Sequence, residues 1–131
     1  MSNLSLSIKV LVVEDQLSVR QIIKNGLKNI GYKDVHDAIH GEEGLAKLKG
    51  GGFGLVIADW NMPVMTGIEL LRAVRTDPAL KSIPFLMITA ERTQENILAA
   101  AQAGVSGYLV KPFPEDNLRE KLEKVLAKKS T

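Results

Sequence analysis

The sequence contains no cysteine, which excludes disulfide bonds, a thiol nucleophile and thiolate metal ligands. It also has no long hydrophobic run, because apolar strings such as Val10 to Val13 fall far below the ~20 residues that a membrane-spanning helix needs. Residues Met1 to Ser7 lack the basic segment of a secretory signal. We therefore expect a cytoplasmic protein in which any bound metal ion is held by oxygen or histidine.

Neither sign of charge is in large excess. Seventeen Lys and Arg against 15 Asp and Glu leave a formal net charge of +2, which does not support a nucleic-acid partner, and we expect no membrane partner either. The 131 residues suit one domain, and 45% hydrophobic with 24% charged residues is the balance of a globular protein with a buried core. We predict a monomeric single domain over residues 1–131, with short flexible ends at about 1–6 and 128–131.

Short apolar runs alternate along the chain with longer stretches that have the apolar spacing of a helix. Glycine or proline marks several helix ends: Gly31 and Gly104 suit C-caps with positive φ, and Pro114 suits the first position of the last helix. This alternation predicts an α/β protein, with a doubly wound five-stranded parallel sheet and helices on both faces. The predicted strands are residues 8–13, 35–38, 53–58, 84–89 and 107–110.

Polar side chains stand where the predicted strands end. Ligands of open α/β sheets bind beyond the carboxyl ends of the strands, so these side chains are the candidate site. They are Glu14 and Asp15 after the first strand, Asp59 after the third, Thr89 at the end of the fourth and Lys111 after the fifth. One edge of the sheet should thus gather three carboxylates, a hydroxyl and an ammonium.

Three clustered carboxylates repel one another, so the site should either hold a proton or bind a hard cation. Mg²⁺ fits best, since it accepts carboxylate and phosphate oxygens together and thereby favours phosphoryl transfer. Asp59 is the candidate nucleophile for an acyl phosphate, with Mg²⁺ and Lys111 offsetting the charge on the phosphoryl oxygens. Thr89 could donate a hydrogen bond to one of those oxygens and so sense the phosphate.

Each of these residues also has an ordinary explanation. The acidic pair could favour a helix N-terminus, residues 59–63 could form a turn, Thr89 could cap a helix and Lys111 could be a solvated surface lysine. Unrelated turns have no reason to collect these groups at neighbouring strand ends, so their joint placement favours the functional interpretation.

Four segments carry a resemblance to a known family. They are residues 59–63 (DWNMP), 87–91 (MITAE), 96–104 (NILAAAQAG) and 107–113 (GYLVKPF). Together they resemble the receiver domains of response regulators, most closely the single-domain chemotaxis members, and the resemblance extends from Lys9 to Lys124. It implies a flavodoxin-like (βα)5 fold with strand order 2-1-3-4-5. It also implies a regulatory protein, not an enzyme, that promotes its own phosphorylation and dephosphorylation.

The resemblance assigns roles to the site residues. Asp59 is expected to accept a phosphoryl group from the phosphohistidine of a chemotaxis-type histidine kinase. Asp15, Asp59 and the backbone carbonyl of Asn61 are expected to ligate Mg²⁺, and Glu14, an aspartate in most of the family, to assist through water. By the same resemblance, the Lys111–Pro112 peptide bond should be cis.

The resemblance also assigns residues to the conformational change on phosphorylation and to the later loss of phosphate. On phosphorylation, Thr89 is expected to move toward the phosphate and Tyr108 to turn inward, which remodels the face of the fourth helix, fifth strand and fifth helix. Asn61 and Glu91 occupy positions that tune how water reaches the acyl phosphate, so autodephosphorylation should be fast. Trp60, the single tryptophan, should report metal and phosphate binding by its fluorescence.

The output partner that the resemblance favours is a flagellar motor switch protein; the alternative is a phosphate sink or phosphorelay receiver that does not bind the motor. A phosphatase partner stays open, because Thr93 and Gln94 replace two lysines of enteric members. Two other classes compete with a receiver. An aspartyl-phosphate hydrolase would want an acid where Asn61 stands, and in a flavodoxin-like flavin protein Glu14 and Asp15 would repel the flavin phosphate.

Overall fold

The structure, a computed structural model, describes residues 6–129. It contains one five-stranded parallel sheet in the order β2-β1-β3-β4-β5, which confirms the predicted fold class. The predicted flexible ends fall mostly outside the described residues. The strands, each within one residue of its prediction, are β1 (Lys9–Val13), β2 (Asp34–Ala38), β3 (Phe53–Ala58), β4 (Phe85–Thr89) and β5 (Gly107–Val110).

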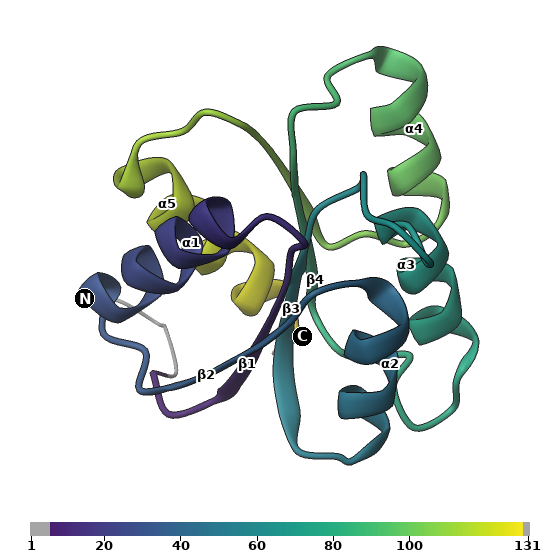
Figure 1. The fold of residues 1–131 in the computed structure, drawn as a ribbon, viewed down its shortest axis with the longest axis horizontal. Helices are drawn as coiled ribbons and strands as arrows, with labels where there is room; N and C mark the ends of the chain where they lie inside the picture. Colours follow the sequence, from purple (N-terminus) through teal and green to yellow (C-terminus); the bar gives the residue numbers. More distant parts are fainter. Residues whose placement is uncertain (1–5, 130–131) are drawn as a thin grey trace.

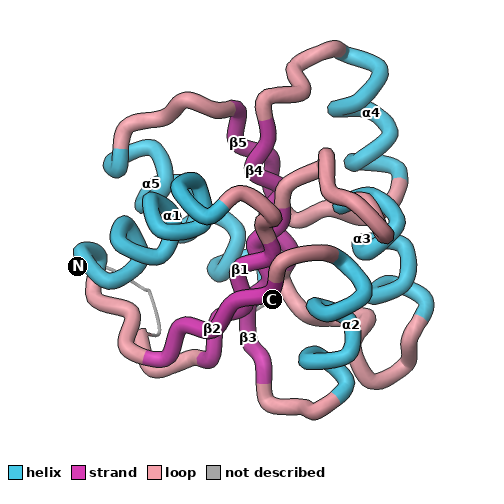
Figure 2. Tube along the Cα trace, viewed as in Figure 1, coloured by secondary structure: helices cyan, strands magenta, loops and turns pink. Residues whose placement is uncertain are grey.

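Helices cover both faces of the sheet (Figures 1 and 2). Strand side chains alternate between two cores: Val10 and Val12 belong to the core beneath α1 and α5, whereas Leu11 and Val13 belong to the core beneath α2, α3 and α4. In the part of the chain that is described, no helix is long and apolar enough to cross a membrane. The helices are α1 (Leu17–Ile30), α2 (Gly41–Lys49), α3 (Gly67–Thr76), α4 (Gln94–Gln102) and α5 (Glu115–Lys129).

The helix ends follow the local sequence. Gly31 ends α1 with φ +125°, and Gly104 follows α4 with φ +94°, as predicted. Thr66 and Glu69 form a reciprocal capping box at the start of α3. The Thr66 cap fixes where α3 begins relative to β3, and the two glycines fix where α1 and α4 end.

Helix α4 is the least buried of the helices on its face. Ala100 is its buried residue, while Leu98 is 57% exposed. The Arg75 guanidinium of α3 donates to the carbonyl oxygen of Gly104, just after the C-terminal end of α4 (2.8 Å). The same guanidinium donates to the carbonyl oxygen of Ile83, just before β4 (2.6 Å). The C-terminal end is therefore held to α3, whereas the first turn has little apolar packing to fix it.

The Tyr32 side chain carries an unusual buried polar atom. The residue is 2% exposed, and its hydroxyl has no hydrogen-bond partner among residues 6–129. Burial, with a smaller contribution from the charge of Glu123, raises the Tyr32 pKa to about 12. We expect Tyr32→Phe to raise the free energy of unfolding by about 1 kcal/mol at pH 7 in urea denaturation, because a buried unsatisfied hydroxyl costs about 1–3 kcal/mol.

The same residue predicts a pH dependence. An unfolded tyrosine ionises near pH 10, so the unfolded state loses its proton first and the wild type loses stability from about pH 10 to 12, by roughly 1.4 kcal/mol per pH unit. Tyr32→Phe should lack this loss. Tyr108→Phe is the matched control, since the Tyr108 hydroxyl donates a hydrogen bond and its removal should destabilise. A destabilised Tyr32→Phe at pH 7 would contradict the prediction.

Candidate functional site

Three carboxylates meet at the carboxyl edge of the sheet, as predicted. Sheet hydrogen bonding continues one residue past the strands: the Glu14 amide donates to the Ala38 carbonyl (3.0 Å) and the Asp59 amide to the Val13 carbonyl (3.2 Å). Glu14, Asp15 and Asp59 each offer an oxygen, and these oxygens lie within 4.8 Å of one another. Glu14 is fully buried, Asp59 is 8% exposed and Asp15 is exposed, so the cluster opens to solvent on the Asp15 side.

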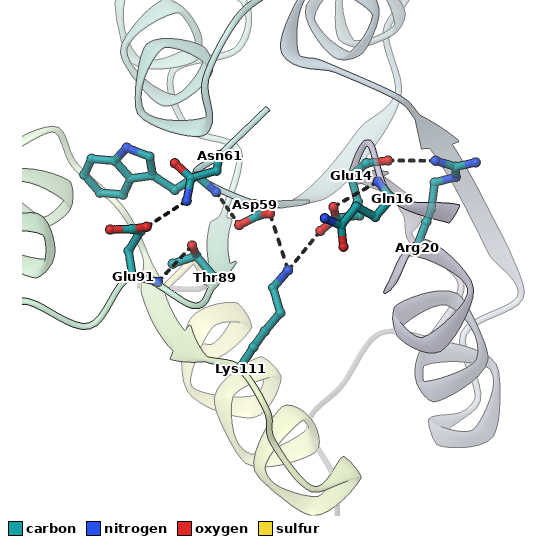
Figure 3. A network of polar contacts seen from close by, with 9 residues as sticks. Glu14, Gln16, Arg20, Asp59, Asn61, Thr89, Glu91 and Lys111 are labelled. Carbon is teal, nitrogen blue, oxygen red and sulfur yellow. Dashed lines mark hydrogen bonds and ion pairs between the residues drawn. The ribbon is translucent and has the colours of Figure 1, made fainter. Parts of the chain in front are cut away.

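The Lys111 ammonium lies between two of these carboxylates. Its Nζ is 3.2 Å from Glu14 Oε1 and 3.3 Å from Asp59 Oδ2 (Figure 3). Burial raises the pKa of the Glu14 carboxyl, and the charge of Asp59 adds to this effect, while the Gln16 amide and Lys111 oppose it. One ammonium does not balance three carboxylates, so the site keeps excess negative charge. Clustered carboxylate oxygens with excess negative charge fit a hard divalent cation.

The second Asp59 oxygen is held by the loop toward α3. Oδ1 accepts a hydrogen bond from the Trp60 amide (2.7 Å), and the Trp60 carbonyl accepts one from the Gly67 amide (2.8 Å). A Cβ added to Gly67 would lie 2.1 Å from the Asp59 carbonyl oxygen, so only glycine fits there. Val64, in the loop between Trp60 and Gly67, has φ +70°, an unfavourable conformation for a β-branched residue. Sequence analysis identified neither Val64 nor Gly67.

A second polar cluster centres on Glu91. Its amide donates to Thr89 Oγ1 (3.2 Å), and its carbonyl accepts the Tyr108 hydroxyl hydrogen bond (2.7 Å). Its carboxylate accepts from Asn61 Nδ2 (2.7 Å) and Asn96 Nδ2 (2.8 Å). Burial, then the charges of Glu91 and of the Asp59 carboxylate, raise the pKa of the tyrosine hydroxyl. Four predicted site residues thus meet in one network, which links the loop after β3 to α4 and β5.

Other groups at this edge hold the site in place. Arg20 Nη1 donates to the Glu14 carbonyl oxygen at 2.8 Å (Figure 3). The Arg20 Nε also lies 3.2 Å from Asp37 Oδ2. Sequence analysis did not identify Arg20, because its position in α1 carries no motif. The Lys111–Pro112 bond is cis, as the resemblance implied. His40 lies outside the carboxylate cluster and caps α2, since its Nδ1 accepts a hydrogen bond from the Glu43 amide.

Comparison with known proteins identifies the same architecture. A family model described as the response regulator receiver domain matches residues 10–123. A chemotaxis protein CheY of Pseudomonas aeruginosa is 50% identical over 117 residues, covering 89% of this chain and 94% of the relative. The crystallised chemotaxis protein CheY4 of Vibrio cholerae has a TM-score of 0.85 at 42% identity, covering 92% of this chain and 99% of that one.

A third similarity bears on the acidic cluster. The receiver domain of a Pseudomonas aeruginosa sensor histidine kinase has a TM-score of 0.84 at 25% identity, covering 92% of this chain and 98% of that one. Its structure is described as having a magnesium ion coordinated in the active-site cleft. The chain shares that fold, and its own three carboxylates gather at the carboxyl edge of its sheet.

Proposed function

The chain belongs to the response regulator receiver family, and we propose on that premise that it is a signalling switch thrown by phosphorylation of Asp59. The observation that carries the proposal is the placement of Lys111 Nζ between Glu14 and Asp59, beside a third carboxylate. A largely buried carboxylate with a cation at one oxygen and an amide donor at the other is fixed in orientation and ready for attack on phosphorus.

In the proposed reaction, an Asp59 oxygen attacks the phosphorus of a histidine kinase's phosphohistidine. The new O–P bond forms as the P–N bond breaks, and the released imidazole takes a proton from solvent. Lys111 offsets the charge that builds on the phosphoryl oxygens. Asp15, Asp59 and the Asn61 carbonyl would hold Mg²⁺, with Glu14 acting through water, and the ion when bound would neutralise further phosphoryl charge.

We assign the switch to the residues around Glu91. The Thr89 hydroxyl accepts a hydrogen bond from the Glu91 amide, and it would be drawn toward a phosphoryl oxygen on Asp59. The Tyr108 hydroxyl is bonded to the same loop through the Glu91 carbonyl, so a shift of Thr89 reaches β5 through shared backbone. The receiver would then bind its target with the face of α4, β5 and α5.

The proposed setting is bacterial chemotaxis, in the cytoplasm. The relatives that match nearly the whole chain are described as chemotaxis proteins, and the matched residues cover 94% of each of them. We propose a chemotaxis-type kinase as phosphodonor and a flagellar motor switch protein as target. Autodephosphorylation, tuned by Asn61 and Glu91, would reset the switch, with or without a phosphatase.

Metal removal tests the chemistry. With Mg²⁺ and phosphoramidate, the purified protein should gain a phosphoryl adduct in intact-mass measurement and change its Trp60 fluorescence. With EDTA in place of Mg²⁺, both signals should be lost, since three carboxylates and one ammonium leave the attacking group in excess negative charge. Full phosphorylation without metal would contradict the proposed metal site.

Binding tests the output. The phosphorylated protein should bind the motor switch protein at least about tenfold more tightly than the unphosphorylated one, a typical allosteric coupling. Surface plasmon resonance with and without phosphodonor measures this ratio. Equal affinities would contradict motor control, and normal phosphorylation without target binding would favour a phosphate sink.

A further inference from the structure

The Glu91 carboxylate is bound at both oxygens by side-chain amides from different elements. Asn61, two residues after Asp59, donates to Oε2, and Asn96, in the first turn of α4, donates to Oε1. Glu91 itself lies in the loop after β4, with no regular secondary structure to fix its side chain. The two amides therefore hold this carboxylate in place. Because Asn96 anchors the carboxylate from α4, the carboxylate in turn holds the Asn61 amide.

The Asn96 bond also crosses from the site to the output face. The first turn of α4 is fixed by the Thr93 cap, which accepts the Asn96 amide hydrogen bond, more than by apolar packing. Asn96 thus uses its backbone to start the helix and its side chain to hold Glu91. A shift of that turn would break or lengthen the Asn96–Glu91 bond before it disturbs the core.

We propose that Asn96 is a positioning residue for the loss of phosphate from Asp59. The inference rests on the proposed function. In this reaction a water oxygen attacks phosphorus, the bond between phosphorus and the Asp59 oxygen breaks, and inorganic phosphate leaves with the Asp59 carboxylate restored. Under the proposed function Asn61 borders the path of that water; Glu91 holds the Asn61 amide, and Asn96 holds Glu91. Through this chain of contacts the first turn of α4 sets the lifetime of the phosphorylated state.

The consequence is that a bound target can act back on the site. A target that binds α4 and moves its first turn changes the hydrolysis rate, because it changes the position of the donor that holds Glu91. A target that leaves the turn in place preserves the rate. The face proposed to carry the output signal would then also control how long that signal lasts.

Two variants of Asn96 test the proposal in the full chain. Asn96→Ala removes the side-chain donor. Asn96→Asp keeps the shape of the side chain, and its negative charge is stabilising at the positive end of the helix dipole, but it loses the donor and repels Glu91. After phosphoramidate is removed, phosphate release should slow about three- to tenfold in both, the ratio that corresponds to one lost hydrogen bond. Glu95→Gln, in the same exposed turn, is the matched control and should decay like the wild type.

A mutant cycle separates positioning from a general structural effect. In a Glu91→Ala background, Asn96→Ala should cause no further slowing, since the carboxylate it acts through is gone. Equal slowing in both backgrounds would overturn the proposal, as would wild-type decay of Asn96→Asp. If the wild type gains no phosphoryl group from any donor, the proposed function fails. If the wild type is phosphorylated and the Asn96 variants lose phosphate at the wild-type rate, this inference alone fails.

Discussion

Asp59→Asn is expected to gain no phosphoryl group from phosphoramidate or from a histidine kinase, at any Mg²⁺ concentration. An amide has no carboxylate oxygen to form the acyl phosphate, although its carbonyl can still accept the Trp60 amide hydrogen bond. We expect at least about a 10³-fold loss in rate, the scale on which removal of a nucleophile acts. Intact-mass measurement and phosphate release would record it.

Asp15→Asn is the matched control for this loss. Asp15 is exposed and belongs to the same oxygen cluster, so its replacement should weaken Mg²⁺ binding while it leaves the nucleophile intact. Raising Mg²⁺ should therefore restore phosphorylation of Asp15→Asn and not of Asp59→Asn. The opposite result would make Asp15 the phosphoacceptor.

Misfolding would not explain the Asp59→Asn result. The substitution removes one of three crowded carboxylates and keeps the side-chain volume, so without metal the melting temperature should stay equal or rise. The charge of Asp59 also contributes to the raised pKa of the Glu14 carboxyl, which should fall toward its ordinary value in the variant. A lower melting temperature without metal would contradict this account of the site.

The sheet could be predicted because its strands are short and apolar on both faces, as buried parallel strands must be. Residues 53–58 illustrate this, since five of the six are buried. Helix ends could be predicted where the backbone needs a glycine, as at Gly31, whose φ of +125° suits few other residues. The second strand gave the weakest signal, because it lies at the edge and exposes Asp34 and His36.

The carboxylate cluster could be predicted because parallel strands bring their carboxyl ends to one edge. Contacts made by helices and loops could not be predicted in this way. The Asn96–Glu91 bond depends on how α4 lies against the loop after β4, and the Arg20–Glu14 bond on the rotation of α1. Propensity even opposes the conformation of Val64, so the packing of the loop around Gly67 must outweigh it.

Lys111→Met should slow phosphorylation of Asp59 by about 10²–10³-fold, while Mg²⁺ binds more tightly. The side chain that is lost places an ammonium 3.3 Å from Asp59 Oδ2, where phosphoryl charge would build, and removal of one such preorganised group typically costs this much. Mg²⁺ should bind more tightly because the ammonium no longer offsets the charge of the carboxylates. Stopped-flow Trp60 fluorescence would measure both quantities.

Two further variants show whether charge or position matters at Lys111. Lys111→Arg keeps the positive charge on a larger planar group. Its Mg²⁺ affinity should therefore be close to that of the wild type, whereas its phosphorylation rate should stay below the wild-type rate. Lys24→Met removes an ammonium that pairs with Asp37, outside the carboxylate cluster, and should change neither quantity.

The buried Glu14 carboxyl makes the Lys111 result decisive. Its pKa is raised by burial and lowered by Lys111, so without the ammonium it should rise further and Glu14 should hold its proton to higher pH. The Mg²⁺ affinity of Lys111→Met should then increase with pH over a range in which the Mg²⁺ affinity of the wild type no longer changes. If Lys111→Met instead binds Mg²⁺ like the wild type at every pH and is phosphorylated at the wild-type rate, the ammonium between Glu14 and Asp59 has no part in the chemistry.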